Sequence, residues 1–243
     1  MTPEDAQPHL HIVADTKYFV VIDKPPGVCM HYQDGDHPVL PMLENLGYKH
    51  LHLVHRLDTA TSGLLVLAKS AAVAALMFEE FNQHRVQKYY LALSAQKPKK
   101  KQGHMFGGLV KSRRGNYKLT LAPENPVYTQ FFSYSVSQQT IPSLRLFALK
   151  PHSGKTHQLR VSLQSIGAPI LGDARYAKDN SDRMYLHAYQ LAFSLYDEHY
   201  CYQQLPKIGL WFTRIEIVHT IERLGDLSKL KWPSPMAKAV HAL

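Results

Sequence analysis

The 243-residue chain has only two cysteines, Cys29 and Cys201, and no CxxC pair. Two cysteines are too few for a disulfide framework, and without a CxxC pair the usual spacing of zinc ligands is missing. Long apolar runs are also absent: runs such as Phe19–Ile22 and Leu64–Ala68 are far too short to span a bilayer. The N-terminal residues are acidic and polar, unlike a secretory signal. We therefore expect a soluble, cytoplasmic protein that does not meet the membrane.

Negative charge is nearly absent from the middle of the chain. Between Phe81 and Gly172 the sequence has fourteen Lys and Arg residues and one acidic residue, Glu124. The formal net charge of the whole chain is +9, so the remaining residues are slightly acidic. A basic excess confined to one segment predicts a polyanionic partner, and nucleic acid is the commonest soluble one. Charge alone leaves open a basic surface that serves only solubility.

Several catalytic motifs are missing as well. Gly154-Lys155-Thr156 resembles the end of a phosphate-binding loop, but Leu149 stands where such a loop needs its first glycine. His50, His52 and His55 lack a carboxylate or cysteine at metal-binding spacing, so we expect no metal. The sequence contains no GxSxG nucleophile elbow and no glycine-rich cofactor loop after a strand. These absences argue against a hydrolase and against a methyltransferase.

Apolar periodicity predicts more strands than helices. Strands are expected at 10–14, 18–22, 64–68, 89–93, 105–110, 127–136, 144–149, 186–195, 199–203 and 210–218. Helices are expected at 38–46, 71–83 and 156–166, with Ser70 and Thr156 as N-caps and with Gly47 and Gly167 as stops. The helix at 71–83 is expected to bury Val73, Leu76, Met77, Phe78 and Phe81. Because strands and helices do not alternate regularly, we expect an α+β fold with flanking helices on a mainly antiparallel sheet.

Two polar segments concentrate groups that can do chemistry. His55–Leu65 is rich in hydrogen-bonding groups and runs into a buried strand, a setting in which loops often carry catalytic residues. Pro151–Arg160 places Lys155 and His157 at the expected start of a helix, where an RNA phosphate can be held. Arg160 lies about one turn further along the same helix. Each segment taken alone also fits an ordinary ion pair or turn.

A third segment, Lys88–Leu93, reads as a strand with two adjacent tyrosines. Successive side chains of a strand point to opposite faces, so Tyr89 and Tyr90 are expected to differ in surroundings. One of them can belong to the core while the other offers its ring to a base, a contact worth ~1–3 kcal/mol. Both can equally be ordinary strand aromatics.

Taken together, these segments resemble the RluA-like family of pseudouridine synthases. The strongest match is HRLDTATSGLLVLAK at residues 55–69, which resembles the catalytic motif of that family nearly letter for letter. Weaker matches lie at 23–27, before this motif, and at 88–93, 151–176 and 186–188, after it, and all of them occur in the order typical of the family. The resemblance spans about residues 10–195 and implies the pseudouridine synthase catalytic fold, with an RNA-binding cleft across its sheet. It implies a catalytic domain at 10–222, after an N-terminal extension at 1–9 and before a C-terminal tail at 223–243.

The resemblance also implies the reaction. The enzyme would be an isomerase that flips one uridine out of structured tRNA or rRNA and rearranges it to pseudouridine, without cofactor or metal. Asp58 is implied as the catalytic aspartate, acting either as a nucleophile or as a base. Tyr90 would stack on the flipped base, Arg160 would pair with the catalytic carboxylate, and Arg56 would fill the gap that the base leaves. Extruding a base costs a few kcal/mol, which these contacts would offset.

RNA contacts are expected from basic residues around these motifs. The expected RNA-binding residues are His55, Arg56, Lys99, Lys100, Lys101, Arg113, Arg114, Lys155 and His157. The segment 97–118 also carries Phe106 and Tyr117, and it is the expected source of specificity because we expect no N-terminal S4 domain. Ser162 departs from the family, in which many members carry a histidine there. We expect a monomer, and the residues leave open which RNA and which uridine it modifies.

A non-catalytic RNA-binding or chaperone protein with the same fold is the alternative. Binding alone would not need Asp58, Tyr90 and Arg160 together, so the complete set favours an enzyme.

Overall fold

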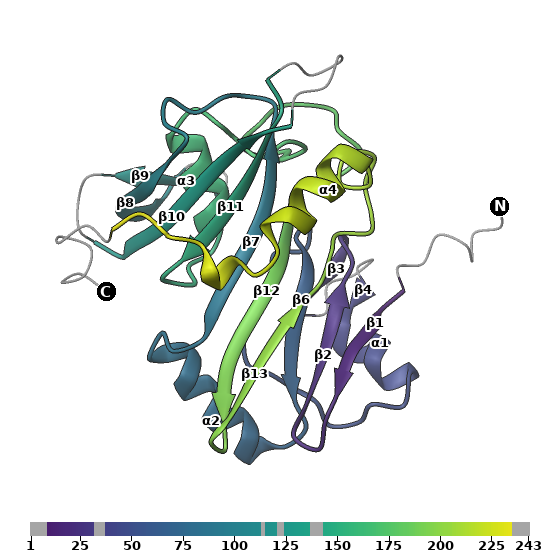
Figure 1. Cartoon of the computed structure of the whole chain (residues 1–243). Coiled ribbons are helices and arrows are strands. Elements are labelled where there is room, and N and C mark those ends of the chain that lie inside the picture. The colour runs from purple at the N-terminus through teal and green to yellow at the C-terminus, as the bar shows by residue number, and fades with distance from the viewer. Residues whose placement is uncertain (1–8, 32–36, 113–114, 121–123, 137–142, 235–243) are drawn as a thin grey trace. The chain divides into compact units, whose positions relative to one another are not determined.

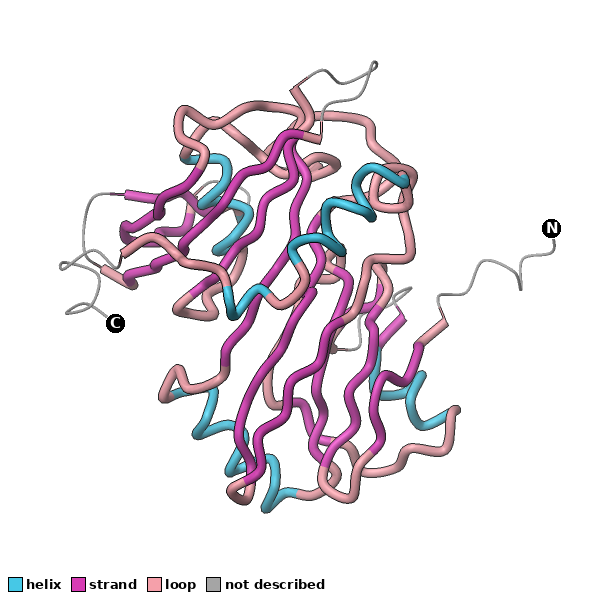
Figure 2. The backbone as a smooth tube through the Cα atoms, viewed as in Figure 1, coloured by secondary structure: helices cyan, strands magenta, loops and turns pink. Residues whose placement is uncertain are grey.

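The computed structural model describes residues 9–31, 37–112, 115–120, 124–136 and 143–234. The chain divides into two compact units, of which the first consists of residues 1–87 and 187–206 and the second of 88–186 and 207–243. Strands predominate in both units, with a few helices beside them (Figures 1 and 2). The expected α+β fold with a mainly antiparallel sheet is therefore confirmed. In the part of the chain that is described, no helix combines the length and the apolar character needed to cross a membrane.

The first unit is built on strands from both ends of its sequence. Its elements are β1 (His11–Asp15), β2 (Phe19–Lys24), β3 (Val28–Cys29), β4 (His37–Pro38), α1 (Val39–Asn45), β5 (His52–Leu53), β6 (Ser62–Ala68), α2 (Ala71–Asn82), β12 (Leu186–Leu195) and β13 (Glu198–Gln203). β2 pairs antiparallel with β1 and β6, and β12 pairs antiparallel with β13. β6 and β12 run parallel, and this pairing brings Gly63 opposite Ala188. The motif at 55–69 therefore leads into a central strand whose seven residues are all buried.

Helix α2 begins as the sequence predicts but buries fewer side chains. Ser70 caps it by accepting a hydrogen bond from the N–H of Val73. Val73 and Met77 are buried, whereas Leu76 is 44% exposed and Phe78 57% exposed. The prediction that all five apolar residues face the core was wrong for these two. Leu76 and Phe78 each lie about 100° around the helix from the centre of the buried stripe, and α2 packs on the unit along that stripe alone.

The second unit contains the basic middle of the chain. Its elements are β7 (Gln87–Ser94), β8 (Gln102–Lys111), β9 (Tyr117–Thr120), β10 (Pro126–Ser135), β11 (Arg145–Pro151), α3 (Gln158–Ser165), α4 (Ile215–Leu224) and a 3-10 turn at Leu227–Lys229. The strands are ordered β7-β11-β10-β8-β9, each antiparallel to its neighbour. α3 packs on β8, β9 and β10 (Figure 1). This packing fixes the helix that carries Arg160 against the sheet.

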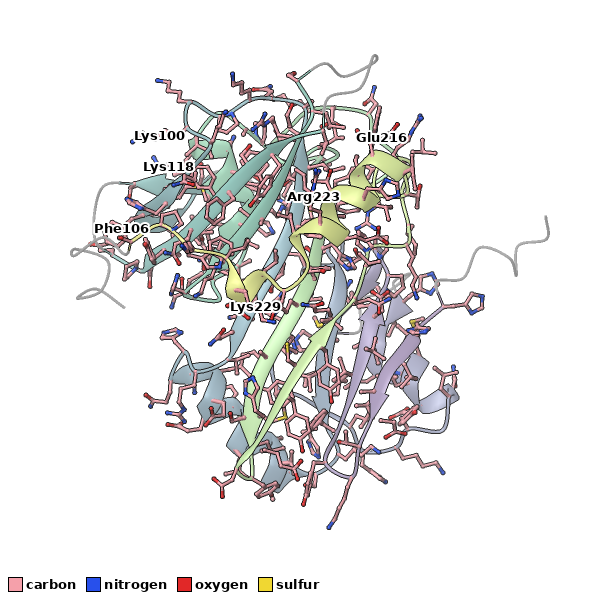
Figure 3. The ribbon with its side chains drawn as sticks, in the orientation of Figure 1. Lys100, Phe106, Lys118, Glu216, Arg223 and Lys229 are labelled. Atoms are coloured by element: carbon pink, nitrogen blue, oxygen red, sulfur yellow. The ribbon has the colours of Figure 1, made fainter. Side chains whose placement is uncertain are left out.

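The strand expected at 210–218 is wrong, because this segment enters helix α4. The β-branched Ile215, Ile217 and Val218 suggested a strand, but the side chains that α4 buries are Ile217, Thr220 and Ile221. Their spacing of three and four residues is helical. Figure 3 labels Glu216 in the first turn and Arg223 in the last, positions at which each charge favours the helix dipole. The boundary expected at residue 222 falls inside this helix.

Candidate active site

Asp58 lies on a loop that ends in a tight turn before β6. Leu57 beside it is buried, whereas Asp58 itself is half-buried. The N–H of Thr61 donates to the carbonyl oxygen of Asp58 at 2.9 Å, and β6 begins at the next residue. A carboxylate at this point is held by a rigid strand while water still reaches it.

A fully buried lysine holds this loop. The ammonium of Lys24 donates to three carbonyl oxygens, those of Pro25 at 3.0 Å, Val28 at 2.8 Å and Thr59 at 3.2 Å. The N–H of Gly27 also donates to the oxygen of Thr59, at 2.9 Å. A buried cation is tolerated when its donors are satisfied, and here the acceptors are backbone atoms. Lys24 thereby ties the residue after Asp58 to the turn at 25–28, a role that the sequence did not reveal.

The junction of the loop with β6 is fixed by a buried histidine. Ser62 Oγ lies 2.8 Å from His187 Nδ1, and His187 Nε2 lies 2.8 Å from the carbonyl oxygen of Gln204. A carbonyl oxygen can only accept, so Nε2 carries the proton. In a neutral ring Nδ1 then accepts from the Ser62 hydroxyl. The side-chain amide of Gln204 donates in turn to Asp23 at 3.0 Å, which extends the network to β2.

His55 and Arg56, both expected to bind RNA, have different surroundings. His55 Nε2 accepts a hydrogen bond from the N–H of Val66 at 3.0 Å, and its ring stacks on Phe81 with centroids 4.6 Å apart. His55 therefore fastens the loop to β6 and α2. Arg56 is exposed, as a side chain must be to enter a gap in an RNA stack. The RNA contacts of both residues stay predictions.

The two tyrosines of β7 differ as expected. Tyr89 is 1% exposed, its ring stacks on Trp232 at 5.8 Å, and the ammonium of Lys150 lies 5.6 Å from its centroid. Tyr90 is half-buried on the opposite face and pairs with Leu149 of β11. Tyr89 is thus a core residue, and Tyr90 is the candidate for stacking on a base.

Lys88 shares the face of β7 that carries Tyr90, because the two residues are two positions apart. Burial lowers the pKa of Lys88 to about 8. A methyl group added at Gly154 would lie 3.4 Å from its ammonium, so the lysine packs directly over that glycine. The sequence had marked Lys88 only as part of a motif, but its position makes it a candidate site residue.

Helix α3 starts two residues later than expected. Thr156 is not its N-cap; His157 occupies that position with a left-handed φ of 57°. The segment before the helix is held instead by the side chain of Gln158. Its oxygen accepts hydrogen bonds from the Ser153 hydroxyl at 2.9 Å and from the Lys155 N–H at 3.1 Å. Lys155 is exposed and His157 is half-buried, which leaves both open to the expected role in RNA binding.

Arg160 points toward a carboxylate that the sequence did not single out. Its Nε and Nη2 donate to the two oxygens of Asp173, each at 2.7 Å. The ring of Tyr176 lies over the guanidinium, with 5.2 Å between its centroid and Cζ. Both residues belong to the matched segment 151–176, but neither had been given a role. Asp58 belongs to the first unit, whereas Tyr90 and Arg160 belong to the second.

The lysines before and within β8 and β9 are exposed. Lys99, Lys100 and Lys101 are exposed in the loop that precedes β8, and Figure 3 labels Lys100 together with Phe106 on β8 and Lys118 on β9. Arg113 and Arg114 lie outside the described residues. Tyr117 is half-buried and packs against the core of the second unit, with its ring 5.5 Å from that of His157.

The two units differ strongly in charge. Residues 1–87 and 187–206 contain six Lys or Arg and twelve Asp or Glu, a formal charge of −6. Residues 88–186 and 207–243 contain 22 Lys or Arg and seven Asp or Glu, which gives a formal charge of +15. The basic excess therefore belongs to the unit that carries Tyr90 and Arg160.

Comparison with known proteins identifies the family of this chain. The family model described as RNA pseudouridylate synthase matches residues 18–165. An uncharacterized RNA pseudouridine synthase of Haemophilus influenzae is 41% identical over 216 residues, which cover 88% of this chain and 95% of that protein. Ribosomal large subunit pseudouridine synthase C of Rickettsia bellii is 31% identical over 76% of this chain, but the match covers only 64% of that longer protein.

Two further similarities concern a tRNA enzyme and a solved structure. The tRNA pseudouridine synthase C of Pasteurella multocida is 29% identical over 76% of this chain and 86% of its own length. The structure of human RNA pseudouridylate synthase domain containing 1 is 25% identical, with a TM-score of 0.71 over 81% of this chain and 83% of that one. The family match extends over more than half of the sequence and includes Asp58, Tyr90 and Arg160. The chain therefore belongs to the RluA-type family of RNA pseudouridine synthases, which are isomerases.

Proposed function

We propose that this protein converts one specific uridine of a structured rRNA or tRNA to pseudouridine, with Asp58 as the catalytic carboxylate. The observation that carries the proposal is the placement of Asp58. It follows the HRL of the family motif on a loop that His55 fastens before Asp58 and that Lys24 and Ser62 fasten after it, and its side chain stays partly open to water. Such support favours a carboxylate that must meet a substrate in one fixed orientation.

The reaction needs bond exchange but no net oxidation. The N1–C1′ bond of the uridine breaks, C5 forms the new bond to C1′, and the proton of C5 leaves to solvent while N1 regains one. Asp58 either attacks the ribose carbon or removes a ribose proton, and both routes need the ionised carboxylate. Tyr90 would stack on the extruded base, while Arg160 would stabilise negative charge during the exchange.

RNA binding is assigned mainly to the second unit. Its formal charge of +15 supports phosphate contacts, to which Lys99, Lys100, Lys101 and Lys155 are all exposed. Arg56 in the first unit would take the place of the flipped base. We expect a cytoplasmic monomer that needs neither cofactor nor metal.

Substitution of Asp58 by Asn tests the proposal. RNA labelled with tritium at uridine C5 and extracted from cells that lack the protein releases tritium when uridine is isomerised. We expect Asp58→Asn to lower the rate by at least ~1,000-fold, as loss of a catalytic group does, with RNA affinity within a few-fold of wild type. Asp197→Asn is the matched control, because Asp197 is exposed in the turn between β12 and β13 and its positive φ suits asparagine.

Two results would contradict the assignment. Full tritium release by Asp58→Asn would show that another group performs the chemistry. RNA binding with no release by the wild-type protein would instead favour the non-catalytic RNA-binding alternative.

A further inference from the structure

Arg160 is held on two sides within the second unit. Its side chain is 8% exposed and that of Asp173 is 0% exposed, and two parallel hydrogen bonds of 2.7 Å join them. A bidentate pair of this kind fixes the plane of the guanidinium as well as its position. The guanidinium also lies over the ring of Tyr176, with Cζ 5.2 Å from the ring centroid.

Asp173 is itself fixed by the backbone that follows it. Its Oδ1 accepts from the N–H groups of Arg175 at 3.0 Å and Tyr176 at 3.3 Å. The same carboxylate therefore binds both the backbone of its own loop and the guanidinium of Arg160. Tyr176 is anchored too, because its hydroxyl accepts from the N–H of Tyr117 at 2.9 Å and lies 3.2 Å from His157 Nδ1.

The loop before Asp173 is tied to the strand that carries Tyr90. The N–H of Leu171 donates to the carbonyl oxygen of Leu93 on β7 at 2.8 Å, and the N–H of Tyr185 donates to the oxygen of Leu171 at 2.8 Å. Leu93 lies three residues after Tyr90 on the same strand. These contacts connect the loop that carries Asp173, the partner of Arg160, to the strand that carries Tyr90.

A planar guanidinium has limited ways to present its donors. The edge formed by Nε and Nη2 faces Asp173, so the edge that includes Nη1 must face another direction. We propose that Asp173 and Tyr176 are positioning residues, which lock Arg160 in the one orientation that the reaction needs. The catalytic part of this inference rests on the proposed function, whereas the locked guanidinium does not.

The decisive variant is Asp173→Asn, compared with Asp179→Asn. Asp179 lies in the same loop, but its carboxylate accepts only from the backbone N–H groups of Gly172 and Ser181 among the contacts described. We expect Asp173→Asn to lower kcat by about 100-fold, the effect of a misplaced catalytic group, with KM within about threefold. Asp179→Asn should lower the melting temperature while kcat stays within about threefold of wild type. Both kcat values are measured with the C5-tritiated RNA and divided by the folded fraction.

A second measurement does not depend on activity. In protein labelled with ¹⁵N-arginine, the Nε–H of Arg160 should be protected from exchange and its Nη protons should be resolved, because the guanidinium cannot rotate. The signal is assigned with Arg160→Lys. Asp173→Asn should average the Nη signals, whereas Asp179→Asn should leave them resolved.

Tyr176 variants keep both partners of the buried Arg160–Asp173 pair and provide a second test. Tyr176→Phe removes the anchoring hydroxyl but keeps the ring, so it should lower kcat less than Tyr176→Leu, which also removes the ring and should lower kcat by about tenfold. A wild-type Arg160 whose Nη signals are already averaged would overturn the inference, as would a Tyr176→Leu variant with wild-type kcat. A wild-type protein with resolved signals but no tritium release would overturn the proposed function and leave the lock intact.

Discussion

The two units of this enzyme differ in formal charge. The first, which contains the proposed catalytic Asp58, has a formal charge of −6, whereas the second, which contains Tyr90 and Arg160, has +15. Nearby positive charge favours the ionised form of a carboxylate, and a negative unit alone would repel RNA. If the proposed roles hold, affinity for RNA and the reactive anion come from different parts of the chain.

Each unit also contains a buried cation, and the partners differ. Lys24 donates to three backbone carbonyls, so its role is to hold turns of the chain together around Asp58. Arg160 donates to a carboxylate through two parallel bonds, which fix its orientation. A flexible ammonium suits the first role, whereas a planar fork suits the second. The comparison separates a cation that shapes a loop from one that is itself positioned.

The largest effect on stability is expected at one glycine in each unit. A methyl group at Gly63 would lie 2.3 Å from the carbonyl oxygen of Ala188, and one at Gly172 would lie 1.7 Å from that of Arg183. Both glycines also have positive φ, so Gly63→Ala and Gly172→Ala should each lower the free energy of unfolding by at least ~3 kcal/mol. Gly167→Ala is the control, because its φ is 74° but nothing lies within 4 Å of the added methyl.

Urea unfolding measures all three variants. Gly167→Ala should cost only about 1 kcal/mol, the cost of a left-handed φ alone. Equal losses at the three positions would mean that the close backbone contacts at Gly63 and Gly172 do not matter.

A smaller effect is expected on the salt dependence of RNA binding. Replacing Lys99, Lys100 and Lys101 by Gln should flatten the slope of log K against log salt by about 2–3, roughly 0.7–0.9 for each phosphate that is no longer neutralised. The matched control replaces the exposed Lys17 and Lys49 of the first unit by Gln and should leave the slope unchanged. Equal slopes for the two sets would break the assignment of RNA binding to the second unit.

The smallest effect concerns the pH dependence of stability. The pKa of Lys88 is about 8 in the folded protein, below its usual value of 10.5, because burial disfavours the charged ammonium. Between these values the unfolded chain binds more protons than the folded one, so the free energy of unfolding should rise with pH in that window. The rise should be about 1 kcal/mol, since water still reaches the half-buried group, and it should be missing in Lys88→Met.

The comparison of wild type and variant isolates this lysine from other groups. Burial also lowers the pKa of Lys150, which stays in both proteins and therefore cancels. An identical pH profile for wild type and Lys88→Met would show that Lys88 is not desolvated.

The sequence predicts the parts of this molecule that depend on local patterns. The strand at Ser62–Ala68, the cap at Ser70 and the opposite faces of Tyr89 and Tyr90 follow from residue type and periodicity. It failed at α4, because β-branched residues at helical spacing resemble a strand when their burial is unknown.

The candidate site shows the same limit. Asp58, Tyr90 and Arg160 stand in recognisable motifs, whereas Lys24 and Asp173 gain their roles only from contacts that the fold creates. Lys24 is 35 residues from Thr59 along the chain, and Asp173 is 13 residues from Arg160. Neither separation corresponds to a helical or strand period, so no local pattern could have revealed the pairs.

The central claim is that Asp58 converts a defined uridine, and transcriptome-wide mapping of pseudouridine tests it most directly. The map is made in cells that lack the protein and in the same cells supplied with wild type or with Asp58→Asn. We predict that one site or a small set of sites in rRNA or tRNA loses the modification, and that only the wild-type protein restores it. Identical maps with and without the protein, or restoration by Asp58→Asn, would contradict the account.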